Sequence, residues 1–434
     1  MLKRKFYDFL KSWKETKKNE CLLVKGARQI GKTFIIDKFG KDNYDNYYYL
    51  NFFEHPEYKK IFDDDLMPET IYSNITLYIH DFKIEQGKTM IFLDEIQYCP
   101  KARTALKFLA IDGRIDIIAS GSLLGIQFKE ETIPSIPVGY ERQVKMHSLD
   151  FEEFLWANGI KEESIDYVKT FFDKKEKVPS AINDKFMSYL RMYMVVGGMP
   201  EVVNVFIETK NYQKVHETQE KILNTYEDDI TQYASVVEKP KIKKCYFSIP
   251  AQLAKENTKF QYSFIEKKAT SRRFANSIDW LVSAGLTEMC KNVSAPLFPL
   301  RGYAKEDQFK LYLSDIGLLT SMFGFELKAA IISNDFSGPI KGGIYENLVL
   351  DILSKRKIET FYYKTDNNSQ EIEFLLTKNS SIIPVEVKAG NGRTISLNNF
   401  IEEFNPPYAY KMIDGNIGVV GKKITLPLYM AMFI

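Results

Sequence analysis

A glycine-rich loop carries the clearest chemistry in this sequence. It reads Gly26-Ala27-Arg28-Gln29-Ile30-Gly31-Lys32-Thr33, the pattern Gly-x-x-x-x-Gly-Lys-Thr, between an apolar run and a helical segment. Glycines permit positive φ and close backbone approach, so consecutive N–H groups can surround a phosphate chain. Lys32 would reach the β- and γ-phosphates, and Thr33 would place its hydroxyl on Mg²⁺. The negative charge would also be favoured by the N-terminus of the following helix. The loop therefore predicts a nucleotide site.

Two adjacent carboxylates, Asp94 and Glu95, follow a second apolar run, residues 89–93. In nucleotide hydrolases an aspartate at such a strand end would hold Mg²⁺ through water, and the adjacent glutamate would orient or deprotonate the attacking water. With Lys32, these are the predicted catalytic residues. A third apolar run ends in Ser120-Gly121-Ser122, which is either a turn or the source of a γ-phosphate sensor. Ser120 or Ser122 is the candidate sensor, and Ser120 is the serine assigned to the site.

The elements that must position these residues are strands alternating with helices. Residues 22–26, 47–53, 89–97 and 115–119 read as buried strands, and residues 69–82 show helical spacing. This alternation implies a parallel sheet with its ligands at the carboxyl ends of the strands. All three groups of site residues fall there.

Composition sets broad limits on the function. A length of 434 residues suggests two to four domains, and a hydrophobic fraction of 45% is ample for packed cores. Lysines and arginines (59) nearly cancel acids (57), so any nucleic-acid footprint must be local. The four cysteines form no close pair, the opening residues lack an apolar signal core, and no uncharged run approaches the ~18 residues of a membrane span. We expect a cytoplasmic protein without disulfides or a zinc knuckle.

Six motifs lie along the chain, at residues 26–33, 92–97, 119–125, 137–139, 149–155 and 193–201. Together they resemble the prokaryotic AAA-family P-loop ATPases whose C-terminal region is a domain of unknown function (DUF4143). The resemblance covers nearly the whole chain and implies ATP and Mg²⁺ as cofactors, with hydrolysis of the ATP. Such ATPases complete their sites with an arginine of a neighbouring subunit, for which Arg114 and Arg142 are possible, although an ordinary surface arginine is the favoured interpretation of each. In related clades an arginine that contacts nucleotide follows the Gly-Gly-x-Pro turn, where this chain has Glu201.

The middle of the chain reads as helical. Residues 161–240, broken at Gly197-Gly198-Met199-Pro200, fit the lid that the resemblance implies. Residues 241–325 follow the outline of a winged helix, with helical segments at 242–255, 263–268 and 270–285 and strands at 287–290 and 308–313.

A basic cluster lies in this segment. Between positions 239 and 273 the sequence has ten basic residues and only two acids, Glu256 and Glu266. The cations predicted to meet DNA phosphates are Lys241, Lys243, Lys244, Arg272 and Arg273. The alternative is that these side chains only solvate helix faces.

The C-terminal residues resemble the PD-(D/E)XK nuclease core. Glu346 lies on a predicted helix, Glu373 on one strand of a hairpin formed by 361–364 and 371–376, and Glu386 and Lys388 on a following strand. In that core carboxylates bind Mg²⁺ and the lysine positions or activates the attacking water. Glu373 stands where the pattern most often has aspartate, and one extra methylene alters the tight octahedral geometry that Mg²⁺ demands. A retained fold without cleavage is the alternative.

The predicted fold is α/β. A P-loop AAA parallel sheet (1–160) with a helical lid (161–240) precedes a winged-helix-like segment (241–325) and a PD-(D/E)XK nuclease-like α/β domain (326–434). The predicted function is an ATP-driven switch that acts on or binds DNA, with a homo-oligomer possible. The alternatives are an ATP-gated metal-dependent nuclease and an ATPase that regulates a protein partner.

Overall fold

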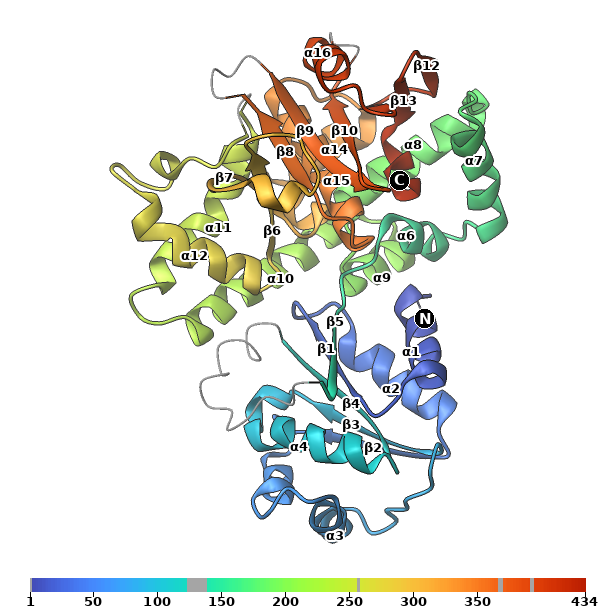
Figure 1. The fold of residues 1–434 in the computed structure, drawn as a ribbon, viewed down its shortest axis with the longest axis vertical. Helices are drawn as coiled ribbons and strands as arrows, with labels where there is room; N and C mark the ends of the chain where they lie inside the picture. The colour runs from blue at the N-terminus through green and yellow to red at the C-terminus, as the bar shows by residue number, and fades with distance from the viewer. Residues whose placement is uncertain (1, 123–138, 256–257, 366–369, 391–393) are drawn as a thin grey trace. The chain divides into compact units, whose positions relative to one another are not determined.

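The computed structural model describes residues 2–122, 139–255, 258–365, 370–390 and 394–434 (Figure 1). The motif residues 123–125 and 137–138, and Glu256 of the basic segment, lie outside the described residues. The chain divides into two compact units. The first holds residues 3–147 and 283–285, and the second holds residues 148–282 and 286–434. In the described part of the chain, no helix has both the length and the apolar character that crossing a membrane would need.

The first unit is built on a five-stranded sheet in the order β2-β3-β4-β1-β5, with every neighbouring pair parallel. Its elements are α1 (Lys5–Thr16), β1 (Cys21–Gly26), α2 (Lys32–Asn43), β2 (Asn46–Asn51), η1 (Pro56–Phe62), α3 (Pro68–Tyr78), β3 (Thr89–Asp94), η2 (Ile96–Tyr98), α4 (Pro100–Asp112), β4 (Asp116–Ser122) and β5 (Glu141–Lys145). The predicted parallel sheet is confirmed. The helix expected over 69–82 ends earlier, at Tyr78.

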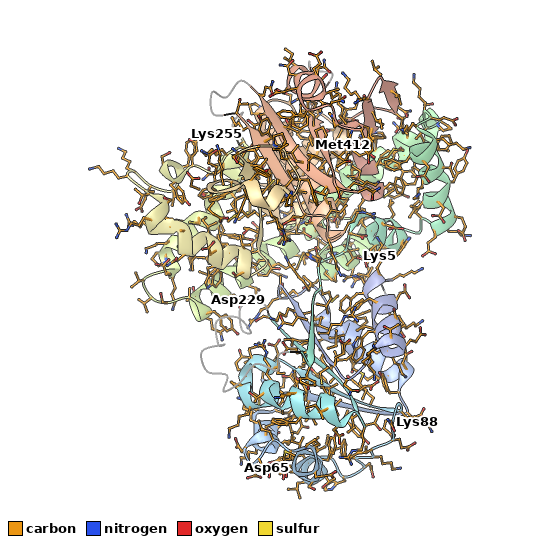
Figure 2. The ribbon with its side chains drawn as sticks, viewed as in Figure 1. Lys5, Asp65, Lys88, Asp229, Lys255 and Met412 are labelled. Carbon is orange, nitrogen blue, oxygen red and sulfur yellow. The ribbon has the colours of Figure 1, made fainter. Side chains whose placement is uncertain are left out.

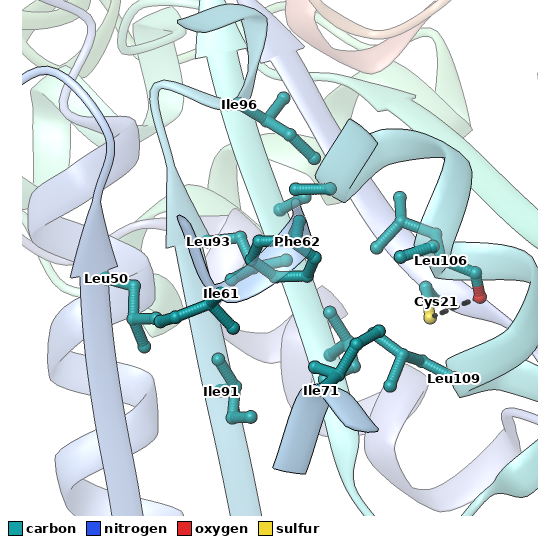
Figure 3. Packing of buried hydrophobic residues seen from close by; sticks show 14 of the residues in the cluster. Cys21, Leu50, Ile61, Phe62, Ile71, Ile91, Leu93, Ile96, Leu106 and Leu109 are labelled. Atoms are coloured by element: carbon teal, nitrogen blue, oxygen red, sulfur yellow. Dashed lines mark hydrogen bonds between the residues drawn. The ribbon is translucent and has the colours of Figure 1, made fainter. Parts of the chain in front are cut away.

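The core of the first unit packs α4, α3 and η1 against one face of this sheet (Figure 3). Leu50, Ile91 and Leu93 come from the strands, and Leu106 and Leu109 come from α4; all are at most 2% exposed. Fully burying one such side chain contributes about 1.5–3 kcal/mol. Cys21 joins this cluster, and its thiol donates a hydrogen bond to the Leu106 carbonyl at 3.4 Å, so it is a packing residue as expected.

The second unit begins with helices and ends in a mixed sheet. Its helical elements are α6 (Phe151–Ala157), α7 (Glu162–Lys174), α8 (Ser180–Val196), α9 (Pro200–Thr209), α10 (Tyr212–Tyr233), α11 (Lys239–Leu253), η4 (Tyr262–Phe264), α12 (Ser271–Ser283), η5 (Leu300–Tyr303), α13 (Ile316–Met322), α14 (Phe325–Ser333), α15 (Pro339–Lys355), α16 (Ile395–Phe404) and η6 (Leu428–Phe433). Its strands are β6 (Thr287–Val293), β7 (Ala304–Leu313), β8 (Phe361–Lys364), β9 (Glu371–Lys378), β10 (Ser381–Lys388), β11 (Ala409–Ile413), β12 (Gly418–Val420) and β13 (Lys423–Pro427).

These strands form one eight-stranded sheet in the order β12-β13-β11-β10-β9-β8-β6-β7. Met412 of β11, labelled in Figure 2, is one of its buried residues. The antiparallel pair β6 and β7 has the pairing expected of a wing, but β6 also pairs in parallel with β8. Because β8 satisfies the free edge of β6, these two strands belong to the C-terminal sheet. The expected boundary at 325/326 therefore runs through one sheet.

A buried ion-pair cluster ties the helices of the second unit together. Lys355 of α15 lies 2.9 Å from Asp351 and 3.6 Å from Asp315, and it donates to the hydroxyl of Tyr193 at 2.9 Å. Asp315 caps α13 and also accepts the Gly198 N–H at 2.9 Å. Residue 198 must be glycine, since a Cβ there would lie 2.0 Å from a carbonyl oxygen. One lysine thus neutralises two buried carboxylates from different elements.

We expect Lys355→Met to destabilise the second unit by about 3–5 kcal/mol, because two buried carboxylates lose their counter-charge. The measurement is urea unfolding followed by tryptophan fluorescence in a Trp13→Phe background, so that the signal comes from Trp156 and Trp280, which both lie in this unit.

The matched control is Lys169→Met, which removes the exposed pair with Asp173 on α7 and should change stability by less than ~0.5 kcal/mol. Equal effects of the two substitutions would contradict a structural role for the buried cluster.

Candidate active site

The glycine-rich loop joins β1 to α2, and its glycines are required by the geometry. A Cβ on Gly26 would lie 2.4 Å from the Ile30 side chain and 2.6 Å from the Met146 carbonyl oxygen. Gly31 caps α2 with φ of +87°, a conformation that favours glycine. The loop N–H groups therefore lie at the start of a helix, where an anion is favoured.

Lys32 and Arg4 hold the loop from within the first unit. The ammonium of Lys32 donates to the carbonyls of Gly26 at 3.1 Å and Ala27 at 2.7 Å. The guanidinium of Arg4 is buried and donates to the carbonyl of Ile30 at 3.2 Å and to that of His147 at 2.7 Å. These contacts fix the backbone of the loop from both sides.

Asp94 is the centre of the site, since four donors converge on its carboxylate. Oδ2 accepts the hydroxyl of Thr33 at 2.9 Å and that of Tyr49 at 3.0 Å. Oδ1 accepts the hydroxyl of Ser120 and the backbone N–H of Glu95 at 3.0 Å. Asp94 is 1% exposed, so these bonds replace the water that a buried carboxylate needs.

The strand order explains why these residues meet. β4 lies between β1 and β3, so Ser120 reaches across to Asp94, while β2 brings Tyr49 from the other side of β3. Ser122, the other candidate serine, is the register partner of Gly26. The structure thus brings Thr33, Asp94 and Ser120 together.

Glu95 follows β3 and has a left-handed backbone with φ of +52°. Burial and the neighbouring Asp94 raise the pKa of Glu95, while Lys32 and a hydrogen bond from Gln97 lower it in part. A carboxylate with a raised pKa beside a phosphate-binding loop is a suitable general base.

Sequence reasoning missed Tyr49 and Arg4. Tyr49 was part of an aromatic run interpreted only as a buried strand. The available signal was the period of two in a strand, which places Tyr49 on the same face as Tyr47. The hydroxyl of Tyr47 lies 3.1 Å from Asp37 of α2. Arg4 had none, because its partners are 26 and 143 positions away.

Arg114 and Arg142, the candidates for the arginine that completes a neighbouring subunit's site, have carboxylate partners in their own unit. Arg114 lies 2.8 Å from Asp112 and 2.6 Å from Glu69, and Arg142 lies 3.5 Å from Glu20.

In the second unit, the structure brings Glu373, Glu386 and Lys388 together. The register that pairs Val385 with Phe374 brings the two glutamates side by side on adjacent strands. The Lys388 ammonium lies 3.1 Å from Glu373 and 3.2 Å from Glu386. Glu346 contacts different groups, with its Oε2 3.1 Å from the ammonium of Lys310. Across the described residues, no group of three or more His, Cys, Asp or Glu side chains is placed to hold a metal ion.

The cations predicted to meet DNA are largely paired. Lys241 lies 2.6 Å from Glu238, Lys243 lies 2.9 Å from Glu227, and Lys244 lies 2.7 Å from Glu266. Arg273 also contacts Glu266. Arg272 is exposed at the first turn of α12. Glu227 and Glu238 precede the basic segment in sequence, which is why a count over that segment overlooked them.

Three family models match the chain. Residues 18–155 match an AAA domain, residues 187–329 match a domain of unknown function (DUF8612), and residues 341–428 match a domain of unknown function (DUF4143). The second match spans the expected boundary between lid and winged helix at 240/241. No curated protein matches the chain.

Among solved structures, the Walker-type ATPase PABY2304 of Pyrococcus abyssi is 11% identical and has a TM-score of 0.42, with 74% of this chain and 96% of that chain covered. The ORC2 protein of Aeropyrum pernix in ADPNP and ADP complexes is 13% identical with a TM-score of 0.33, covering 73% and 88%. AMPPCP-bound DnaA from Aquifex aeolicus is 12% identical with a TM-score of 0.30, covering 64% and 87%.

We expect Tyr49→Phe to lower ATP turnover about 10–100-fold, because the hydroxyl that orients Asp94 is removed while the ring is kept. Steady-state turnover of purified protein measures this. Tyr48→Phe is the matched control, since the neighbouring hydroxyl donates to the Asp81 carbonyl on the other face and should leave turnover unchanged. Equal rates in the two variants would remove Tyr49 from the site.

Proposed function

We propose that this protein, a P-loop ATPase of the AAA type over residues 18–155 with a DUF4143 region over residues 341–428, uses ATP turnover as a molecular switch that acts on DNA. The observation that carries the proposal is the convergence of Thr33, Tyr49 and Ser120 on Asp94, next to a phosphate-binding loop. Loss of γ-phosphate contacts on hydrolysis is a recurrent way to release an ordered conformation.

The loop residues have the chemistry to hold the phosphates. They are Gly26, Ala27, Arg28, Gln29, Ile30, Gly31, Lys32 and Thr33. In the proposal the loop N–H groups and the Lys32 ammonium bind the phosphate oxygens. Thr33 would hold Mg²⁺ directly and Asp94 would hold it through water, and the ion would supply charge neutralisation for phosphoryl transfer. The oxygen donors of both residues suit that ion, and their 2.9 Å contact joins the two sides of the site.

Glu95 is the proposed general base. It orients the attacking water and accepts its proton, for which the carboxylate must be ionised. Ser120 is the proposed sensor, because its hydroxyl links β4 to Asp94 and would respond to the γ-phosphate. Any arginine supplied in trans would come from a homo-oligomer.

The proposed DNA contact rests on Arg272 and Arg273 at the start of α12, with Lys241, Lys243 and Lys244 of α11. Helix starts and basic side chains suit phosphate oxygens. Lys255, labelled in Figure 2, adds a further cation just after α11. Four of these five cations already pair with glutamates, so each has less charge to offer to DNA phosphates. A protein partner is therefore the competing target. The cytoplasmic location stays a prediction.

The second candidate is an ATP-gated nuclease. It is favoured by the gathering of Glu373, Glu386 and Lys388 on adjacent strands, because metal-dependent cleavage uses residues of these types. That activity requires a divalent cation on these carboxylates.

We expect the Glu95→Gln variant to bind ATP but to turn it over about 10²–10⁴-fold more slowly, because no base remains.

In the wild type, the raised pKa of Glu95 means that its carboxylate becomes protonated at a higher pH than an ordinary glutamate does. ATP turnover should therefore begin to fall at a correspondingly higher pH on the acid side. Gln97→Ala should move this acid limb further up, since Gln97 lowers that pKa. The measurement is turnover against pH. Full turnover by Glu95→Gln or by Lys32→Ala would refute the assignment.

We expect Arg272→Glu with Arg273→Glu to weaken DNA binding at least about tenfold and to reduce the slope of log affinity against log salt by about 2. Fluorescence anisotropy with a labelled duplex at several salt concentrations tests this. The charge-matched control is Lys174→Glu with Lys177→Glu, both exposed. A flat salt dependence, or equal losses in both variants, would favour the protein partner.

A further inference from the structure

The nuclease-like pattern implies a divalent cation between the carboxylates of the C-terminal sheet, and the contacts of those carboxylates test whether one fits. Mg²⁺ takes six oxygen ligands in near-ideal octahedral geometry at about 2.0–2.1 Å. Its protein ligands must therefore present oxygen atoms that are not already committed to other strong partners.

Lys310 of β7 is the unexpected member of this cluster. Its side chain is 0% exposed, and its ammonium lies 3.1 Å from Glu346 of α15 and 2.8 Å from Glu371 of β9. A lysine is rarely fully buried unless it is paired. Burial lowers the pKa of Lys310, but the charges of Glu346, Glu371 and Glu373 together raise it above the usual lysine value, so the ammonium stays charged. A permanent cation therefore lies among the carboxylates that the pattern assigns to a metal.

The oxygen of Glu346 that faces Lys310 is saturated. Oε2 accepts the hydroxyl of Tyr312 at 2.8 Å and that of Thr258 at 3.1 Å, in addition to the ammonium at 3.1 Å. Three donors on one oxygen occupy the lone pairs that a metal would need. Ligation by this oxygen would require all three contacts to be given up.

The two strand carboxylates are occupied as well. Lys388 lies within 3.2 Å of both, and the Val387 N–H donates to Glu373 Oε2 at 3.2 Å. Glu386 Oε2 is buried without a hydrogen-bond partner. This single oxygen would supply only one of the six ligands that Mg²⁺ takes. Glu346, Glu371, Glu373 and Glu386 carry four negative charges against three positive charges from Lys310, Lys364 and Lys388, so one excess negative charge is left to attract a cation.

We propose that Lys310 supplies from within the chain the positive charge that the nuclease-like pattern takes from a divalent cation, so that this centre binds neither Mg²⁺ nor Mn²⁺. The centre then links β7, α15 and β9 through ion pairs. Because breaking a buried pair leaves an uncompensated charge, loss of Lys310 is costly unless another cation enters or a carboxylate is neutralised. The proposal concerns the second unit alone and stands independently of ATP turnover.

The first measurement is Mn²⁺ binding by the nucleotide-free full chain, counted by electron paramagnetic resonance, beside Glu373→Gln with Glu386→Gln. The proposal expects the same number of bound Mn²⁺ ions in both proteins at up to about 1 mM Mn²⁺, and no Mn²⁺-dependent DNA cleavage that the double variant lacks. A bound Mn²⁺ ion, or cleavage, that the double variant loses would overturn the proposal and support the nuclease.

The second measurement is the Tm with and without Mn²⁺. Lys310→Met should lower Tm by about 5–10 °C. Added Mn²⁺ should recover part of that loss in this variant while leaving the wild-type Tm unchanged. Lys364→Met is the matched control, because Lys364 pairs with Glu371 at 2.6 Å but is partly exposed, so its loss should be smaller and insensitive to Mn²⁺.

A double variant that keeps the charge balance distinguishes lost charge compensation from a general failure to fold. Lys310→Met with Glu346→Gln removes one charge of each sign and should recover much of the Tm lost by Lys310→Met alone. If the double variant is no more stable than the single one, Lys310 does not act by compensating Glu346, and the proposal fails.

Discussion

The buried carboxylate of Asp94 is the constraint on which the first unit depends. A carboxylate that is 1% exposed is unfavourable unless donors replace its water, and here the donors come from α2, β2, β4 and the residue that follows β3. Only the strand order of this sheet brings those elements to one point. The requirement to satisfy one charged group therefore also aligns the phosphate-binding loop with the residues proposed to hydrolyse ATP.

Local signals in the sequence were enough to predict the loop, the carboxylate pair and the parallel sheet. Gly26 and Gly31 are dictated by close contacts and by φ, and such demands leave a visible pattern of residue types. Tyr49 and Arg4 could not be assigned in this way, because their roles depend on which strands become neighbours. An aromatic residue in a buried strand and an arginine near a helix start have many ordinary roles. Only the fold selects the one that contacts the site.

Charges in the second unit show the same limit more strongly. The basic segment was interpreted from a window of sequence, yet Glu227 and Glu238, which neutralise part of it, lie before that window. The nuclease-like residues were found by spacing, but Lys310 entered no motif because it lies on a strand assigned to a different domain. Sequence gives the sign and number of charges, whereas the pairing of those charges decides whether a cluster binds a ligand or stabilises the fold.

The sheet that joins β6 to β8 also has a consequence for synthesis of the protein. A ribosome releases the chain from its N-terminus, so the β6–β7 hairpin emerges well before residues 361–364 can pair with β6. Until then one edge of β6 has unpaired backbone groups and can associate with other chains. The second unit therefore completes its sheet late, and a nascent chain whose β6–β7 hairpin has emerged before residues 361–364 would present an aggregation-prone strand edge for a chaperone to cover.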